Sequence, residues 1–322
     1  MIPRIADPFV GGYDMSVSTV STKQRGFLAV PGTDIQLPYT DIRGTGSGPT
    51  LLITGGVHGG EYPGIESAIR FATSLDPSRL NGRVKVIHMT NPPAFYAKRQ
   101  YVSPLDEKNL NRVFPGNMTG TPTERVAAVI IEALREADFW VDLHGGDIHE
   151  ALVPFTIFSD RGPQEVVHQA EAMARAYGIS HILRSSSIAG GSYATAAEMG
   201  IPAILTESGQ VGQLEETAVT IHLNGLEQLL RHLGMVPQSP VPPVGAPLLT
   251  QFIWVSAPST GLYYSALKPG QHVRQGETGG VVKDVFGDII SHVPVPQDGV
   301  VLFTVTSLAI NTGEPLFAVA AP

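Results

Sequence analysis

The sequence contains no cysteine among its 322 residues, so neither disulfide bonds nor a catalytic thiolate can contribute to its fold or chemistry. It also lacks a basic cluster, and its formal net charge of −8 and pI near 5.7 argue against nucleic acid as the main partner. No apolar run approaches the length needed to span a membrane. The N-terminal residues show no charged region followed by a continuous apolar run, as a signal peptide would. We therefore expect a globular cytoplasmic protein without membrane contact.

Strand-like and helix-like segments alternate through the first two thirds of the chain. Apolar runs typical of strands occupy residues 51–54, 83–90, 139–143, 154–158 and 201–206, after two shorter runs joined at Pro31-Gly32. Helical spacing of apolar residues marks 61–72, 122–134, 163–177 and 213–233. This alternation predicts an α/β fold, with a mostly parallel sheet flanked by helices on both faces.

The last part of the chain has a different pattern. Residues 237–247 are rich in proline and are predicted to be a linker. Beyond them, residues 248–322 show short β-type runs broken by glycine and proline, without helical period. We therefore predict a catalytic domain at residues 1–236 and a small all-β C-terminal domain at residues 248–322.

The chain is organised around residues 51–69, where a strand runs through a glycine-rich turn into a helix. His58 lies in that turn, and Glu61 begins the helical segment. A His-x-x-Glu pair across such a turn can direct an imidazole and a carboxylate at one point, which suits two of the three protein ligands of a catalytic zinc ion. Alone the pair is weak evidence, because most such pairs are ordinary surface or core residues.

His144 is the candidate for the third ligand. It ends the predicted strand 139–143 and is followed by two glycines, which repeats the strand-end placement of His58. Ligands of open α/β sheets bind at the carboxyl ends of the strands. Asp142 falls on the same strand face as His144, where it can orient the imidazole or act only as a buried strand-end carboxylate.

A zinc hydrolase also needs a carboxylate that is not a ligand, to accept the proton of water and return it to the leaving amine. Glu207 directly follows the predicted strand 201–206, so we expect it to take this role. Asp147 and Glu150 compete with it, although their ordinary interpretation is as solvated loop residues. Arg99 is a surface charge by default, or, if the zinc site exists, a group that polarises the scissile carbonyl.

Residues 91–116 are rich in polar groups, poor in helical pattern and follow a strand end, so we expect a loop over the site. The Asn-Leu-Asn-Arg sequence at 109–112 can offer a guanidinium to a substrate carboxylate, with which arginine forms bidentate pairs. The alternative for Arg112 is a structural ion pair with Asp106 or Glu107.

Five of these segments together resemble the succinylglutamate desuccinylase/aspartoacylase family of zinc-carboxypeptidase-like hydrolases. They are, in chain order, GGVHGGEYPG, NPPAF, NLNRVFPG, VDLHGG and TESG. The resemblance covers roughly residues 25–320 and implies a zinc-carboxypeptidase-like mixed sheet. Its C-terminal residues resemble a lipoyl/biotinyl-like β domain, but no Met-Lys-Met or Asp-Lys-Ala marks an attachment turn, so we expect no attached cofactor and a role in covering the site or in oligomer contacts.

The resemblance also implies roles for single residues. One zinc ion per chain would be held by His58, Glu61 and His144. Glu207 would be the general base, and Arg99 would lie beside the scissile carbonyl. Asn111 and Arg112 would hold the substrate's carboxylate.

The function expected from these residues is zinc-dependent hydrolysis of the amide bond of an N-acyl amino acid or similar small molecule. A metallocarboxypeptidase acting on short peptides is the alternative, because it shares the zinc geometry and differs in its pocket. A binding protein without catalysis is a third possibility, opposed by the complete set of site residues. The expected partner is a small N-acylated substrate, with a homo-oligomer possible.

Overall fold

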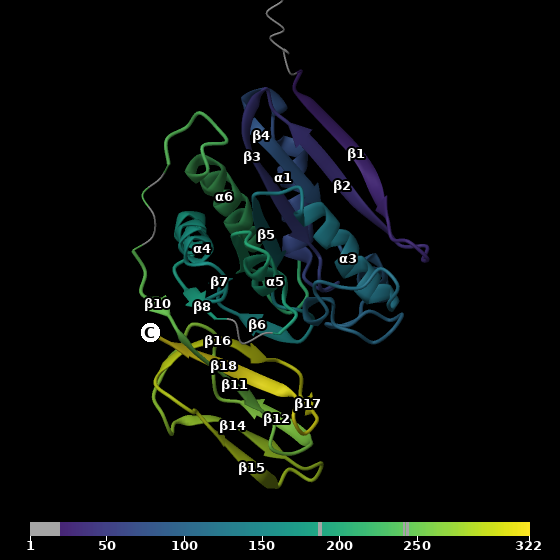
Figure 1. Cartoon of the computed structure of the whole chain (residues 1–322). Helices are drawn as coiled ribbons and strands as arrows, with labels where there is room; N and C mark the ends of the chain where they lie inside the picture. Colours follow the sequence, from purple (N-terminus) through teal and green to yellow (C-terminus); the bar gives the residue numbers. More distant parts are fainter. Residues whose placement is uncertain (1–19, 186–188, 241, 243–244) are drawn as a thin grey trace, which may run out of the picture.

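The computed structural model describes residues 20–322 except 186–188, 241 and 243–244. The start of the predicted catalytic domain and three residues of the predicted linker therefore lie outside the described residues. Figure 1 shows an α/β part with a smaller β part packed beneath it. In the described part of the chain, no helix combines the length and the apolar character needed to cross a membrane.

The α/β part is built on a nine-stranded sheet with the order β1-β2-β4-β3-β5-β9-β7-β8-β10. These strands are β1 (Thr22–Ala29), β2 (Gln36–Arg43), β3 (Gly46–Gly55), β4 (Asn81–Ile87), β5 (Phe139–His144), β7 (Phe155–Phe158), β8 (Ile182–Arg184), β9 (Ala203–Glu207) and β10 (Leu248–Leu249). The central pairs β4/β3, β3/β5 and β5/β9 are parallel, whereas β1/β2, β2/β4 and β7/β9 are antiparallel. The predicted α/β fold is confirmed, and the sheet is mixed.

Helices cover both faces of this sheet, as predicted. The apolar sides of α1 (Tyr62–Ser74), α4 (Gln164–Tyr177) and α6 (Glu216–His232) share one hydrophobic core with one face. The other face packs against α3 (Pro122–Leu134) and α5 (Ser192–Glu198). The described α/β part also contains two short 3-10 turns, at Pro77–Arg79 and Leu110–Arg112.

The expectation of a segment without helix at residues 91–116 is wrong at its start. Helix α2 occupies Pro92–Ala97, and the Asn91 side chain caps it by accepting a hydrogen bond from the Ala94 N–H at 3.3 Å. Six residues with two prolines cannot show a helical period, but proline is well tolerated in a first helical turn and Asn is a favoured N-cap. The rest of the segment is mostly irregular, as expected.

The C-terminal part consists of β strands only, as predicted. One sheet contains β11 (Gln251–Ser256), β18 (Pro315–Ala321), β16 (Gly299–Val305) and β13 (His272–Val273), and the other contains β15 (Ile289–Pro294), β14 (Thr278–Lys283), β12 (Gly261–Ser265) and β17 (Ala309–Ile310). The short strand β6 (Glu150–Leu152) leaves the α/β part and pairs antiparallel with β16. This pairing places the C-terminal part against the loop that follows β5.

Glycines bring the first turn of α1 close to the central strands. Gly56 has φ +73°, which lets the chain turn sharply after β3. A side chain at Gly64 would place its Cβ 2.7 Å from the Leu143 carbonyl oxygen, so only glycine lets α1 approach β5 this closely. The turn after β3 and the end of β5 are therefore neighbours at the carboxyl edge of the sheet.

Candidate metal centre and active site

Glu61 lies at the N-terminus of α1 but does not use its side chain to cap the helix. Its carboxylate turns instead toward the preceding turn, where Oε1 lies 2.6 Å from His58 Nδ1. Both side chains are buried, with Glu61 only 2 % exposed. The strand-turn-helix unit thus brings the predicted imidazole and carboxylate together.

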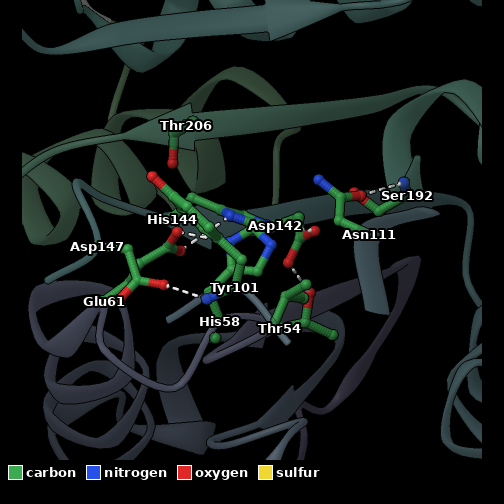
Figure 2. A network of polar contacts seen from close by, with 12 residues as sticks. Thr54, His58, Glu61, Tyr101, Asn111, Asp142, His144, Asp147, Ser192 and Thr206 are labelled. Atoms are coloured by element: carbon green, nitrogen blue, oxygen red, sulfur yellow. Dashed lines mark hydrogen bonds and ion pairs between the residues drawn. The ribbon is translucent and has the colours of Figure 1, made fainter. Parts of the chain in front are cut away.

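His144 completes the predicted triad from the end of β5. Its Nδ1 lies 2.9 Å from Glu61 Oε2, and its ring meets that of His58 edge to face with centroids 5.1 Å apart. The candidate ligand atoms of the three residues all lie within 4.8 Å of one another. Figure 2 shows the three side chains converging from β5 and the turn before α1.

Buried hydrogen bonds fix the orientation of His144. Its Nε2 lies 3.0 Å from Asp142 Oδ2, and the other oxygen of that carboxylate accepts a hydrogen bond from Thr54 Oγ1 at 2.6 Å. Trp140 Nε1 in turn donates to Thr54 Oγ1 at 2.8 Å. The predicted Asp142–His144 contact is therefore present, and it directs Nδ1 of His144 toward Glu61.

His58 is oriented in the same way by Asn109, whose Oδ1 lies 3.1 Å from His58 Nε2. Both imidazoles therefore present Nδ1 to the same carboxylate. Partners of this kind, which hold the second ring nitrogen, are typical of metal-binding histidines.

The three side chains of the triad shift one another's pKa values. Burial favours the neutral form of Glu61, but the two imidazoles outweigh it and lower the pKa of Glu61 to about 2. Burial likewise opposes the charged form of His144, yet the carboxylates of Glu61 and Asp142 raise its pKa well above the usual value. The buried Glu61 carboxylate is therefore ionised only because positive charge lies beside it.

The residues fit a divalent metal ion. Oε2 of Glu61 is buried and has no hydrogen-bond partner in the described part of the chain, although it faces Nδ1 of His144. Two imidazole nitrogens and one carboxylate form a donor set found in catalytic zinc sites. An ion held by His58, Glu61 and His144 would supply the positive charge that the carboxylate requires.

Glu207 ends β9 directly opposite His144 in the parallel register of β5 and β9. Its Oε2 is buried without a hydrogen-bond partner among the described residues. Burial and then the negative charge of Glu61 raise the pKa of Glu207 well above its ordinary value. A carboxyl group placed this way can exchange a proton beside the triad.

These groups line a cavity of about 170 Å³ between the two parts of the protein. Strands of the α/β part contribute an apolar side, formed by Leu152, Phe155, Ile157 and Leu205. The C-terminal part closes the cavity with Phe252, Trp254, Phe303 and Pro315. No signal in the sequence indicated these aromatic side chains, because they reach the site only through the packing of distant strands.

Arg112 lines the cavity and forms no ion pair in the described part of the chain. The alternative pairing with Asp106 or Glu107 is not formed: Glu107 binds Arg99, and Asp106 accepts hydrogen bonds from Thr123. Burial lowers the pKa of Arg112. Its guanidinium donates to a backbone carbonyl at 2.8 Å and is otherwise available to an anion.

Asn111 also lines the cavity and is buried. Its Oδ1 accepts a hydrogen bond from the Ser192 N–H at 2.9 Å, which attaches the 109–112 turn to the first residue of α5. This contact holds Arg112 in place at the cavity wall.

Arg99 is not brought to the cavity. Its side chain is 47 % exposed and pairs with Glu107, and it is absent from the cavity lining. A role for Arg99 beside the scissile carbonyl therefore stays a prediction.

Asp147 and Glu150 are not solvated loop residues, so that interpretation is wrong. Asp147 is fully buried and accepts hydrogen bonds from the N–H groups of Ile148 at 2.7 Å and of Tyr101 at 2.8 Å. It thereby anchors Tyr101, whose ring meets His58 edge to face. Glu150 lines the cavity, where burial and the charge of Glu61 raise its pKa to about 7.

The geometry is that of an α/β protein with a candidate His-Glu-His metal centre in a cavity at the carboxyl edge of its sheet. The succinylglutamate desuccinylase/aspartoacylase catalytic domain matches residues 47–233. The chain therefore belongs to the succinylglutamate desuccinylase/aspartoacylase family.

Similar proteins span nearly the whole chain. An N-alpha-acetyl-L-2,4-diaminobutyric acid deacetylase from Halomonas elongata is 30% identical over 92% of this chain and 91% of its own length. The product-bound structure of the ectoine utilization protein EutE (DoeB) from Ruegeria pomeroyi has a TM-score of 0.85 at 27% identity, covering 93% of this chain and 95% of that one. A succinylglutamate desuccinylase/aspartoacylase from Rhodobacter sphaeroides has a TM-score of 0.84 at 27% identity, covering 94% and 96%.

Proposed function

We propose that the protein is a zinc-dependent deacylase that hydrolyses the amide bond of an N-acyl amino acid. The observation that carries this proposal is the convergence of both Nδ1 atoms on Glu61, with Glu207 and Arg112 in the same cavity. Membership of the family and the deacetylase activity named for the Halomonas elongata relative support the reaction class.

His58, Glu61 and His144 would hold one zinc ion. Bound there, the ion supplies a Lewis acid that polarises an amide carbonyl and lowers the pKa of water. Asp142 and Asn109 keep the two imidazoles in the orientation that binding requires.

Glu207 moves the proton. Its carboxylate takes a proton from the attacking water as oxygen bonds to the amide carbon, and passes it to the nitrogen as the carbon–nitrogen bond breaks. The products are a free amine and a carboxylate, so no oxidant or further reactant is needed. Glu207 has a raised pKa, and its Oε2 has no hydrogen-bond partner among the described residues; both are properties of a group that must accept and release a proton here.

Arg112 would bind the carboxylate of the amino acid half of the substrate. It is the one arginine or lysine among the described residues that line the cavity, and a planar guanidinium pairs well with a carboxylate. Asn111 holds the turn that carries it. The family resemblance implies that Arg99 lies beside the scissile carbonyl. To reach it, Arg99 would have to leave its ion pair with Glu107.

The walls of the cavity favour a small substrate over a peptide. Residues of the C-terminal strands β11 and β16 and the start of β18 close one side of a space of about 170 Å³. A peptide chain leading away from the scissile bond would need an open path on that side. We therefore rank a metallocarboxypeptidase below a deacylase.

The test is release of amine by the zinc-loaded protein from a panel of N-acetyl and longer N-acyl amino acids, with short peptides alongside. We expect turnover of N-acyl amino acids, lost in Glu207→Gln. Turnover of peptides alone would support the carboxypeptidase instead. No turnover of any amide by the zinc-loaded protein would refute both enzymes.

A further inference from the structure

Glu150 is a carboxylate inside the cavity to which the proposed reaction assigns no role. It begins strand β6, which extends from the α/β part to pair with β16 of the C-terminal part. Its backbone is fixed on both sides, because its N–H donates to the Asp147 carbonyl at 2.9 Å and its carbonyl accepts from the Val211 N–H at 2.8 Å. The side chain is therefore held by a rigid strand end, as a recognition group should be.

The Glu150 carboxylate has no cationic partner in the described part of the chain. Among the residues that the structure describes, no ion pair includes it, and its side chain accepts only one long hydrogen bond of 3.5 Å, from the Asp147 N–H. Glu150 is half-buried. A partly desolvated carboxylate without a cation or strong hydrogen bonds is unfavourable, and such groups persist mainly where a ligand uses them. A bound ligand can therefore supply the cationic group that pairs with Glu150.

The charges of the cavity point to the nature of that ligand. A divalent ion and Arg112 would supply three positive charges when the imidazoles are neutral. The carboxylates of Glu61, Glu207 and Glu150 supply three negative charges when ionised, and Asp142 and Asp147, buried beside the triad, add two more. An N-acyl amino acid with an uncharged side chain would add one negative charge to this buried site. A second, cationic group on the substrate would cancel it.

We propose that Glu150 determines specificity by forming an ion pair with a cationic side chain of the N-acyl amino acid substrate, such as a terminal ammonium group. The inference rests on the proposed deacylase function and narrows its substrate class. Arg112 would hold the α-carboxylate while Glu150 holds the side-chain cation. The two residues lie on the same cavity but beyond ion-pair distance of each other, so a small substrate can lie between them.

Aromatic side chains next to Glu150 suit the same ligand. Leu152 lies two residues along β6, hence on the same strand face, and is paired with Phe303 of β16. The Phe303 ring packs against that of Trp254 with centroids 4.6 Å apart, and both rings line the cavity. Aromatic rings attract cations and pack well against the methylene groups that carry them.

The test compares matched substrate pairs that differ only in this charge: Nα-acetylornithine with N-acetylnorleucine, and Nα-acetyl-2,4-diaminobutyrate with N-acetylnorvaline. The readout is the ratio of kcat/KM for the cationic over the neutral member, measured with the zinc-loaded full chain. We expect the wild type to favour the cationic member at least about tenfold, and Glu150→Gln to lower the ratio about thirtyfold or more, the size expected for loss of one partner of a buried charge pair.

Glu198→Gln is the matched control, since Glu198 is an exposed carboxylate on α5 that does not line the cavity. It should leave the ratio unchanged. A wild type that prefers the neutral members would overturn the inference. So would a ratio that stays the same in Glu150→Gln, because the charge of Glu150 would then take no part in recognition.

Calorimetric binding of the same pairs to zinc-loaded Glu207→Gln, with and without Glu150→Gln, separates this inference from the reaction. Turnover of N-acyl amino acids without charge preference would leave the deacylase standing and remove the role of Glu150. If no compound is turned over, a Glu150-dependent preference in binding would still support the recognition role. Absence of binding by every pair would refute the inference, while turnover of other N-acyl amino acids would leave the deacylase standing.

Discussion

Nδ1 of His144 lies 2.9 Å from Oε2 of Glu61, although one ends a strand and the other begins a helix far earlier in the chain. The second oxygen of the same carboxylate contacts His58, so Glu61 joins ligands from two neighbouring strand ends. Because β3 and β5 are parallel neighbours, their carboxyl ends deliver these groups to one edge of the sheet. The centre therefore depends on the sheet order as much as on its three residues.

Removing the partner of His144 should weaken metal binding without abolishing it. Asp142→Asn keeps the shape of the side chain but removes the charge that orients and polarises the imidazole. We expect zinc affinity to fall about 10- to 100-fold, as for other partners of metal-bound histidines. Competition with a chelating dye measures the dissociation constant. An affinity equal to that of the wild type would mean that Asp142 serves only to stabilise the strand end.

Arg112→Met should impair substrates that carry a carboxylate. The long apolar side chain keeps much of the volume of Arg112 but loses its charge and donors. We expect kcat/KM for an N-acetyl amino acid to fall about thirtyfold or more, while its primary amide, which has no carboxylate, is affected much less. Equal losses for the acid and the amide would contradict the role of Arg112 as carboxylate partner.

His88 should make the protein less stable as the pH falls below neutrality. Burial and the nearby charge of Arg25 lower its pKa to about 4, and its Nε2 lies 2.9 Å from Thr40 Oγ1. The unfolded chain takes up a proton near pH 6.5 whereas the folded state resists it until about pH 4, so stability is lost between these values. From pH 7 to 5 the loss is up to about 2 kcal/mol, less where solvent screens the partly exposed ring.

Urea unfolding at pH 7 and pH 5 gives the loss of unfolding free energy between these pH values for the wild type and for His88→Gln. The difference between the two losses is the contribution of His88. The pH-dependent loss of unfolding free energy should be smaller in the variant. His292→Gln, at an exposed histidine of the C-terminal part, is the control and should retain the wild-type dependence. An identical pH dependence in all three proteins would rule out the assigned effect of His88.

The candidate metal ligands and Glu207 could be placed near one another from the sequence. His58, His144 and Glu207 each end or closely follow an apolar strand, and Glu61 begins the helix after the turn that contains His58. Glycines on the chain mark the turns at His58 and His144, and parallel strands bring their carboxyl ends together whatever the loop lengths. Such local signals need no knowledge of which distant segments pair. For Arg112 the sequence left two interpretations open, a carboxylate partner at the site or a structural ion pair with Asp106 or Glu107, and the structure places Arg112 on the cavity without that ion pair.

Glu150 and Trp254 could not be found in this way. Glu150 becomes a cavity residue because β6 pairs with β16, a contact between segments that lie far apart in the sequence. Trp254 reaches the cavity because the C-terminal sheet packs on the α/β part. Neither the pairing nor the packing leaves a periodic pattern, so a polar stretch after His144 looks like a solvated loop. Arg99 is the opposite example, because the sequence suggested a place in the site and the structure places its side chain outside the cavity. There it forms an ion pair with Glu107.

Dependence of amide hydrolysis on the metal tests the proposed site most directly. Amine release from an N-acetyl amino acid would be followed before chelation, after chelation, and during titration with zinc, for the wild type and Glu207→Gln. We expect activity to vanish on chelation and return with one zinc ion per chain. Glu207→Gln should bind the same amount of zinc but react at least about 100-fold more slowly. Full activity in the metal-free protein, or wild-type rates in Glu207→Gln, would contradict the assignment of the site.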